Sequence, residues 1–288
     1  MLPKREDLRY QLSFNAEERE TYTAAKDMAV QCIEDFLQLG QLQGGYRNAL
    51  RKIEVLRQIC NFGRLQQAEE AEVEKLEDVI KAPWDEDAAS LAVNLGDPAT
   101  TTNTSISYGE HGRQFPTKIR ALVDDLRKVP PNTQSFSSIV FSFWKTTLDV
   151  AATALEHEGI TYARIDGDVN SKKRVEIFED FSKQTYRVLL ITLSCGAVGL
   201  NLTSASRAYL MEPQWNPAIE EQALARIYRI GQTRAVTTVR FTIKDSIEKY
   251  VLDVQDSKKD LVTALLSPQA SSSGVSQQRL RELREHLR

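Results

Sequence analysis

The pattern of apolar and polar positions divides the chain into parts with different periodicity. Over residues 16–60 apolar residues recur three and four positions apart, as at Leu50, Ile53 and Leu56, which predicts helices. From about residue 64 to 114 this periodicity fades into an acidic stretch, followed by sequence rich in Thr, Ser, Asn and Gly. Such a segment predicts a flexible linker or a surface insertion.

From residue 117 onward, short apolar runs alternate with segments of helical periodicity. The predicted strands cover residues 137–143, 160–166, 186–192, 206–212 and 235–243. The predicted helices cover residues 117–129, 146–159, 171–183 and 217–230, and a long one begins at 245. Alternation through short connections predicts an α/β fold whose parallel sheet is covered by helices on both faces. The strand at 186–192 is apolar enough to be central and buried on both sides.

These patterns predict four consecutive segments. The first is helical, the second an acidic polar linker, the third the α/β domain, and the fourth a Ser-rich tail that ends in a short helix. Their bounds are 1–63, 64–116, 117–266 and 267–288.

Composition is that of an ordinary soluble globular protein, with 41% apolar and 27% charged residues. No run approaches the roughly eighteen continuous apolar residues that a membrane helix needs, and we expect no signal peptide. The cysteines Cys32, Cys60 and Cys195 are far apart and form no CxxC pair. This usage argues against a disulfide scaffold or a zinc module and is typical of a reducing nuclear or cytoplasmic setting.

The net charge of −3 does not by itself indicate a nucleic-acid-binding protein. Charge is unevenly distributed, however, because residues 64–97 hold ten acidic side chains against three basic ones. The rest of the chain has 34 basic and 30 acidic residues. Local charge therefore leaves nucleic-acid binding open.

The most informative string is QALARIYRIGQTR, from Gln222 to Arg234. On a helix, Gln222, Arg226 and Arg229 lie on one face, and two arginines there can form a guanidinium fork aimed at phosphate. Two arginines at this spacing are also typical of a solvated basic face. We expect Gln214, Trp215 and Asn216 to brace this helix, and Trp215 to pack within the fold rather than contact a ligand.

A glycine-bearing block, LLITLSCGAVGLNLTSASRAYLMEPQWNP, precedes this string at 189–217. After a buried strand, Gly196 and Gly199 let backbone amides approach a phosphate closely. Nearby neutral side chains can donate to the phosphate backbone of a duplex without reading its bases. These are Ser194, Asn201 and Thr203. The alternative is a plain strand-to-loop turn.

A third block spans residues 137–181. Ser142, Trp144 and Lys145 fall where a strand ends, the edge at which open parallel sheets bind ligands. Arg174, with the two lysines before it, opens a helix where it can meet phosphates, although such clusters are usually only solvated. We interpret the Asp-Gly pair at 166–167 as a structural turn.

These blocks resemble motifs IV, V and VI of superfamily-two helicases, in the versions found in SWI/SNF-related ATPases. The RIGQ and GLNLT strings favour that group over RNA helicases, and ICNFG and YLMEPQWNP resemble the helicase-like transcription factor branch, which works in postreplication repair. The resemblance covers 117–265 closely and 1–63 more loosely. It implies the second RecA-like lobe of an ATP-dependent translocase on double-stranded DNA.

The resemblance also implies residue roles. Arg226 and Arg229 would be the catalytic arginine fingers, and the nucleotide cleft would be lined by Gly199, Gln222, Gly231 and Gln232. DNA would be contacted by Ser142, Lys145, Arg174, Thr192, Ser194, Gly196, Asn201 and Thr203. Cys195 and Ala197 depart from the commoner Ala-Gly-Gly version of motif V, with an expected effect on loop flexibility only.

Further expectations concern cofactor, partners and location. The resemblance implies ATP with Mg²⁺, the backbone of double-stranded DNA, a first RecA-like lobe in cis or in trans, chromatin or replication-repair proteins as partners, and a nuclear location. Neither a membrane partner nor a metal site of the chain's own is expected. The acidic linker stands where many members of that branch carry a zinc-binding RING insert, and it lacks cysteine, so ubiquitin-ligase activity is not expected.

The sequence has no GxxxxGK[ST] phosphate loop, and DEDA at 85–88 follows no apolar strand. Because an arginine finger acts on phosphates that other groups hold, we expect negligible ATP hydrolysis by the chain alone. Two interpretations remain: an ATPase lobe that works with a first lobe, or a non-catalytic DNA- or protein-binding remnant of such an enzyme.

Overall fold

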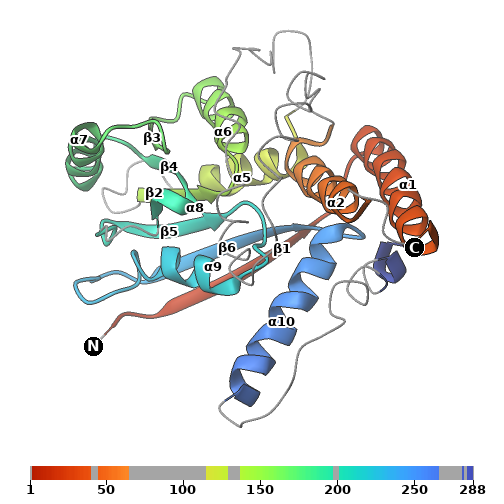
Figure 1. Ribbon diagram of the computed structural model, residues 1–288. Helices are drawn as coiled ribbons and strands as arrows, with labels where there is room; N and C mark the ends of the chain where they lie inside the picture. Colours follow the sequence, from red (N-terminus) through yellow and green to blue (C-terminus); the bar gives the residue numbers. More distant parts are fainter. Residues whose placement is uncertain are drawn as a thin grey trace.

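The structure is a computed structural model in which the strands form one parallel sheet covered by helices (Figure 1). It describes residues 2–39, 45–64, 115–128, 137–196, 201–265, 281 and 284–287. The predicted linker therefore lies almost wholly outside the described residues. No helix in the described ranges is long and apolar enough to cross a membrane.

The sheet has six strands in the order β1-β6-β5-β2-β4-β3, and every pairing between neighbours is parallel. The strands are β1 (Arg5–Leu12), β2 (Ser137–Ser142), β3 (Tyr162–Ile165), β4 (Val188–Thr192), β5 (Ala205–Leu210) and β6 (Val236–Ile243). Every residue of β2 and β4 is buried, as expected for strands covered on both faces. The predicted α/β fold with a parallel sheet is confirmed.

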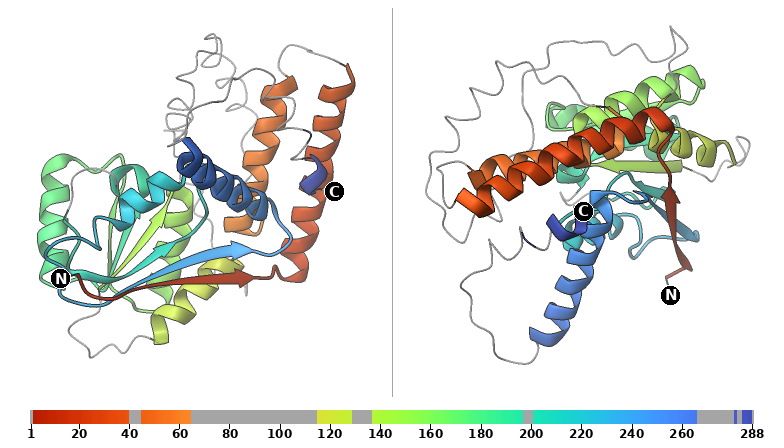
Figure 2. Two further views of the ribbon diagram at one scale, coloured as in Figure 1. Left: turned by 90° about the horizontal axis from the view of Figure 1, so that it is seen from below. Right: turned by 90° about the vertical axis from the view of Figure 1, so that its right-hand side faces the viewer.

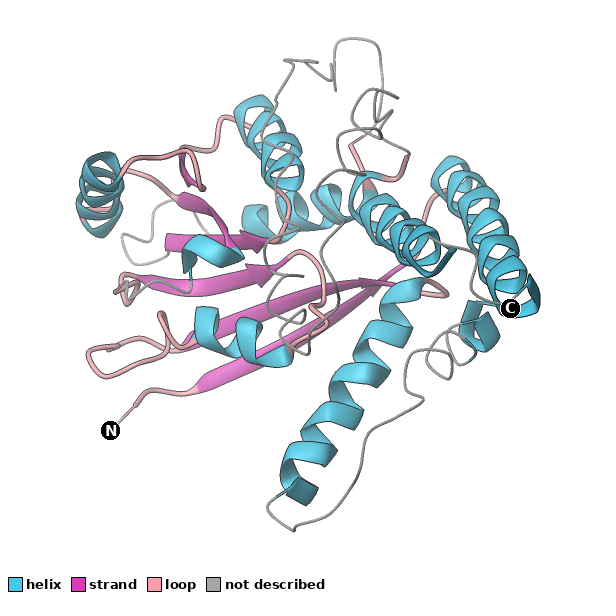
Figure 3. Cartoon of the chain, viewed as in Figure 1, coloured by secondary structure: helices cyan, strands magenta, loops and turns pink. Residues whose placement is uncertain are grey.

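Two layers of helices enclose this sheet (Figure 3). The helices are α1 (Ala16–Leu39), α2 (Gly45–Phe62), α5 (Thr117–Lys128), α6 (Lys145–His157), α7 (Ser171–Ser182), α8 (Leu193–Gly196), α9 (Pro217–Leu224) and α10 (Ile247–Leu265). Val140 and Leu190 face α5 and α6, whereas Ile139 and Leu189 face the side of α7, α8 and α9. The alternation of side chains along each strand thus supplies two separate apolar cores.

Strand β1 was not predicted, because residues 1–63 were assigned to a helical segment. It lies at the sheet edge and pairs with β6, with Arg5 opposite Val236. Leu8, Tyr10 and Leu12 pack against the core while the residues between them are charged or polar. This alternation is visible in the sequence, but its partner strand lies more than two hundred residues away.

The helices predicted over residues 16–60 are confirmed as α1 and α2, which lie side by side (Figure 2). Their apolar residues form a third core with the first turns of α10 and with Leu287 near the carboxyl terminus. Tyr22 is buried there, and its hydroxyl accepts a hydrogen bond from the backbone N–H of Ile247 at 2.6 Å. The helical segment is therefore packed onto the α/β domain and is not a separate arm.

Glu18 joins three helix ends. It caps its own helix, since its carboxylate accepts from the backbone N–H of Asn15 at 3.0 Å and the Asn15 side chain accepts in return from the N–H of Glu18 at 2.8 Å. The same carboxylate accepts from the backbone and hydroxyl of Thr117, which opens α5. Gly63 closes α2 with a φ of +67°, and a Cβ there would lie 2.5 Å from the Glu18 carboxylate. Gly63 at the end of α2 and Thr117 at the start of α5 therefore both lie against the Glu18 carboxylate.

A buried ion pair ties α5 to α10. The ammonium of Lys118 is fully buried and contacts the carboxylate of Glu248, which is 1% exposed. Lys118 Nζ also donates to the carbonyl of Met211 at 2.7 Å and to Asn61 Oδ1 at 3.0 Å. All three donors of the ammonium are used, which is what a buried charge requires.

Replacing Lys118 by Met is expected to lower the free energy of unfolding by about 3–5 kcal/mol, because Glu248 would keep a buried charge without its partner. The matched control is Lys128→Met on the same helix, where the lysine is exposed and the expected effect is within about 0.5 kcal/mol. Urea denaturation followed by circular dichroism measures both. Equal losses in the two variants would contradict the role assigned to the pair.

Candidate functional site

The carboxyl ends of β2, β4 and β5 meet at one edge of the sheet, because these strands are parallel neighbours. The segments that leave this edge are the β2–α6 loop (143–144), the start of α8, and the β5–α9 loop (211–216). Ligands of open parallel sheets bind at such an edge. Four of the predicted site residues lie in or next to these segments: Ser142, Lys145, Thr192 and Ser194.

The arginine-bearing segment begins as a helix but does not remain one. Asn216 caps α9, since its side chain accepts from the N–H of Ala218 at 3.1 Å, and Pro217 occupies the first turn. The helix ends at Leu224, so the prediction of a helix to about residue 230 is wrong. Gln222, Arg226 and Arg229 therefore do not share the face of one regular helix.

Beyond Leu224 the backbone tightens, since the N–H of Arg226 donates to the carbonyl of Ala223 and the N–H of Ile227 to that of Leu224, each three residues back. The carbonyl of Arg226 accepts from the backbone N–H of Leu202 at 3.0 Å, and that of Ile227 accepts from the side chain of Gln232 at 3.2 Å. A continuing helix would need both carbonyls for its own next turn. These bonds bring the segment after the glycine block against the arginine-bearing segment.

Gln232 holds this turn together. Its side chain is buried, donates to the carbonyls of Ala205 and Ile227, and accepts from the backbone N–H of Arg234 at 3.0 Å. The side-chain amide of Gln232 is therefore bonded to backbone groups in this structure. The family resemblance predicts that Gln232 lines the nucleotide cleft. Gly231 before it is exposed and has a φ of +104°, a conformation that favours glycine.

The two arginines lie on the outer side of this turn. Arg229 is exposed and Arg226 is half-buried, and Gln222, near the end of α9, is exposed too. Ile230 between Arg229 and the glycine is 92% exposed, the highest exposure among the large apolar residues of the described ranges. The turn thus offers cationic groups to a ligand outside the domain rather than to its core.

The structure describes the glycine block except for residues 197–200. Thr192 ends β4 and is buried, and Ser194 is exposed with its hydroxyl 3.3 Å from that of Thr192. Gly196 is the last residue of α8, while Gly199 lies outside the described residues.

Beyond the glycines, Asn201 is exposed, and its side chain accepts from the N–H of Thr203 at 3.3 Å. Thr203 itself is half-buried. The neighbouring bond from Leu202 to Arg226 places these two residues beside the arginine-bearing turn.

Three other predicted DNA contacts are used within the fold. Ser142 is fully buried, and its hydroxyl donates to Glu212 and accepts from the N–H of Trp144 at 3.2 Å. In this structure its side chain does not reach the surface. Lys145 Nζ lies 3.1 Å from both carboxylate oxygens of Asp168.

Arg174 braces the turn before α7. Its guanidinium donates to the carbonyls of Val169 at 2.7 Å and Asp166 at 2.9 Å. The Asp166 carboxylate is 6% exposed and accepts from Arg164 Nε at 2.8 Å and from the N–H of Asp168 at 3.0 Å. The interpretation of residues 166–167 as a structural turn agrees with these bonds.

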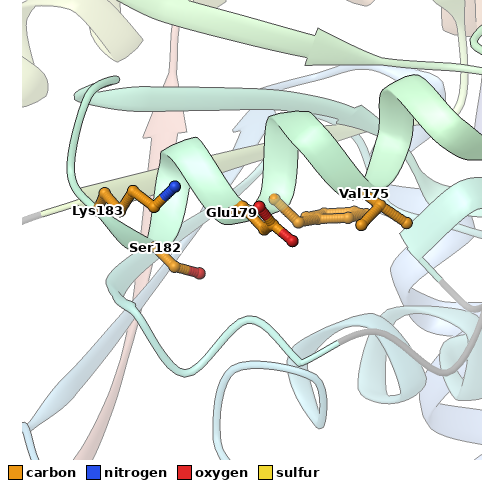
Figure 4. A pocket seen from close by; sticks show the side chains of 5 residues that line it. Val175, Glu179, Ser182 and Lys183 are labelled. Atoms are coloured by element: carbon orange, nitrogen blue, oxygen red, sulfur yellow. The ribbon is translucent and has the colours of Figure 1, made fainter.

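The exposed side of α7 carries a shallow hollow of about 430 Å³ (Figure 4). It is lined by Val175, Phe178, Glu179, Ser182 and Lys183. None of the predicted site residues lines it.

Comparison with known proteins identifies the central part of the chain. The helicase conserved C-terminal domain matches residues 117–231. Residues 117–231 form a helicase C-terminal domain. The chain is 39% identical over 168 residues to DNA repair protein RAD5B of Arabidopsis thaliana and 35% identical over 170 residues to the helicase-like transcription factor of Oryctolagus cuniculus. Each match covers 58% of this chain but only 13% and 17% of the two relatives.

Solved structures show the same fold beyond the helicase domain. The C-terminal part of the Fun30 ATPase domain matches with a TM-score of 0.69 at 18% identity, over 100% of this chain and 99% of that one. The Sulfolobus solfataricus SWI2/SNF2 ATPase core in complex with dsDNA matches with a TM-score of 0.63 at 17% identity, over 98% of this chain and 50% of that one. The α/β fold, with its helical amino-terminal part, is thus that of these ATPase structures.

Sequence reasoning missed Glu212, which lies in the β5–α9 loop at the carboxyl edge of the sheet. It is 2% exposed and accepts hydrogen bonds from Asn61 Nδ2 at 2.9 Å, from Gln214 Nε2 at 3.3 Å, from the Ser142 hydroxyl and from the N–H of Phe143. Burial raises its pKa to about 7, against the effect of these donors and of Lys118. A carboxylate directly after an apolar strand was the available signal.

The pKa of Glu212 makes the stability of the helicase domain depend on pH. Since the pKa is raised from 4.5 to about 7 on folding, the folded chain holds a proton that the unfolded chain loses between these values. The free energy of unfolding should therefore fall by about 3 kcal/mol as pH rises from 4.5 to 7, and then level off. Urea denaturation at a series of pH values measures this slope.

The matched variant is Glu212→Gln, which keeps the side chain's shape but cannot titrate. It should be less stable, because an amide NH₂ would face donors, and should lack the slope that Glu212 contributes between pH 4.5 and 7. An unchanged slope in this variant would assign the pH dependence to other groups.

Proposed function

We propose that this chain is the second RecA-like lobe of an ATPase that moves on double-stranded DNA, and that it supplies Arg226 and Arg229 to ATP hydrolysis. The observation that carries the proposal is the hydrogen bond from Leu202 to the carbonyl of Arg226. It joins the segment that follows the glycine block to the arginine-bearing turn at one edge of the sheet. The proposed DNA contacts at Asn201 and Thr203 and the proposed nucleotide contact at Arg226 are thus joined by a backbone hydrogen bond.

In this proposal the turn would contact only the γ-phosphate end of a bound ATP. Arg226 and Arg229 present guanidinium groups whose planar donors match phosphate oxygens, and bound ATP would supply the γ-phosphate on which they act. An arginine that stabilises charge on the transferred phosphate raises the rate by roughly 10³–10⁵-fold. We assign Mg²⁺ and the grip on the β- and γ-phosphates mainly to a first lobe, in cis or in trans. Among the described residues no group of three acidic, His or Cys side chains could hold a metal ion.

The DNA contacts that we propose are Lys145, which follows the β2–α6 loop, and three neutral side chains. Ser194 and Asn201 are exposed and Thr203 is half-buried, and such side chains can donate to phosphate oxygens of a duplex without reading its sequence. The solved SWI2/SNF2 core with dsDNA and the DNA repair proteins among the relatives support this ligand. On the same grounds we place the chain in the nucleus, in repair or chromatin remodelling, with proteins of those processes as partners.

DNA-stimulated ATP hydrolysis tests the proposal. The chain alone should hydrolyse ATP negligibly, and addition of a matching first lobe should produce activity that duplex DNA stimulates. Arg229→Ala should lower that rate by roughly 10³-fold, and Arg229→Lys should restore little of it, because an ammonium lacks the planar fork. The control is Arg51→Ala, which removes an exposed arginine on α2.

The outcomes separate the two interpretations. Strong hydrolysis by the chain alone would overturn the assignment of half a site. Salt-sensitive binding of duplex DNA without activity on mixing would instead identify a non-catalytic DNA-binding module.

A further inference from the structure

Arg57 of α2 is buried between two tryptophans. Its guanidinium carbon lies 5.0 Å from the ring centroid of Trp144 and 5.3 Å from that of Trp215, and the residue is 3% exposed. Its Nη2 donates to the carbonyl of Pro213 at 2.9 Å, and its Nη1 lies 3.1 Å from the carboxylate of Glu54. The buried charge is thus satisfied by a carboxylate, a carbonyl and two aromatic faces.

The two tryptophans belong to different loops at the carboxyl edge of the sheet. Trp144 is in the β2–α6 loop, directly before Lys145. Trp215 is in the β5–α9 loop, directly before Asn216, which caps the helix that leads to the arginines. Arg57 therefore connects the loop at the end of β2 with the loop that begins the arginine-bearing segment.

Asn61, one turn further along α2, connects the first turn of α6, which follows the β2–α6 loop, with the β5–α9 loop. It is fully buried, and its Nδ2 donates to Thr147 Oγ1 at 3.1 Å and to Glu212 Oε2 at 2.9 Å. Thr147 is in the first turn of α6, and Glu212 is in the β5–α9 loop. Lys118 fixes the amide by donating to Asn61 Oδ1 at 3.0 Å. Two residues on one face of α2 thus make parallel bridges.

α2 is well suited to hold these loops in place. Ile53, Leu56 and Ile59 bury its apolar face against α1 and α10, so the helix is itself held by the third core. A displacement of either loop must disturb Arg57 or Asn61, and through them the other loop. This helix lies outside residues 117–231, the part that the helicase domain match covers.

We propose that Arg57 and Asn61 are positioning residues that hold the β2–α6 and β5–α9 loops at a fixed separation. Through this connection, DNA bound beside the β2–α6 loop, where Lys145 follows Trp144, aligns the turn that carries Arg226 and Arg229. The proposal rests on the proposed function and adds to it the part of the chain that transmits the effect of DNA. Neither residue contacts nucleotide or DNA itself.

The test compares Arg57→Lys with Arg51→Lys in the mixture of chain and first lobe. Lysine keeps the charge of Arg57 but lacks the plane that stacks between two indoles and the fork that reaches both oxygen partners. The ratio of ATPase rates with and without saturating duplex should fall about tenfold in Arg57→Lys, because small errors of alignment are costly. It should stay at the wild-type value in Arg51→Lys, whose arginine is exposed on the same helix. A purely structural defect would lower both rates in proportion and leave the ratio unchanged.

An unchanged ratio in a folded Arg57→Lys variant overturns this inference, whereas no activity in the wild-type mixture overturns the proposed function itself. If Arg57→Lys fails to fold, Thr147→Val decides. That variant keeps the shape of the side chain and removes only the oxygen that accepts from Asn61. Its ratio should fall about threefold, in keeping with a single lost hydrogen bond, and a wild-type ratio would overturn the proposal.

Discussion

The buried hydrogen bonds around Glu212 are the constraint on which the rest of the structure depends. Its carboxylate accepts from the ends of β2 and β5 and from Asn61 of α2, and Asn61 in turn is held by Lys118, which pairs with Glu248 of α10. Buried polar groups are costly unless every one finds a partner, so these segments have only one mutual arrangement in which the network is complete. The network makes the helical segment and the helicase domain a single unit.

The arginine-bearing turn depends on a similar competition between partners. The backbone carbonyls of Arg226 and Ile227, just beyond α9, accept from Leu202 and Gln232 and not from a continuing helix. The arginines consequently lie on a turn that is hydrogen-bonded to the segment after the glycine block. Asn201 and Thr203, which we propose as DNA contacts, are in that segment. An unbroken helix would have presented the same side chains without that connection.

Much of the fold could be predicted because most of its strands and helices have a recognisable pattern in their own local sequence. The runs at β2 and β4 are apolar throughout, Asn216 and Pro217 mark the start of α9, and α1 and α2 show helical spacing. β1 was missed because its partner is distant in sequence. The end of α9 was misplaced because the residues beyond Leu224 bond to Leu202 and Gln232, which local periodicity does not reveal. Ser142 was assigned to the surface because position at a strand end does not reveal that a buried carboxylate lies behind it.

The sequence by itself determined the alternation of strands and helices, the strings that mark a helicase C-terminal domain, and the identity of Arg226 and Arg229 as its most informative residues. Only the tertiary structure decided which polar residues face solvent and which are used internally, as with Ser142, Arg174 and Gln232. It also revealed Arg57 between Trp144 and Trp215. Periodicity and motifs report on neighbours along the chain, whereas the burial and pairing of a polar group depend on segments that folding alone brings together.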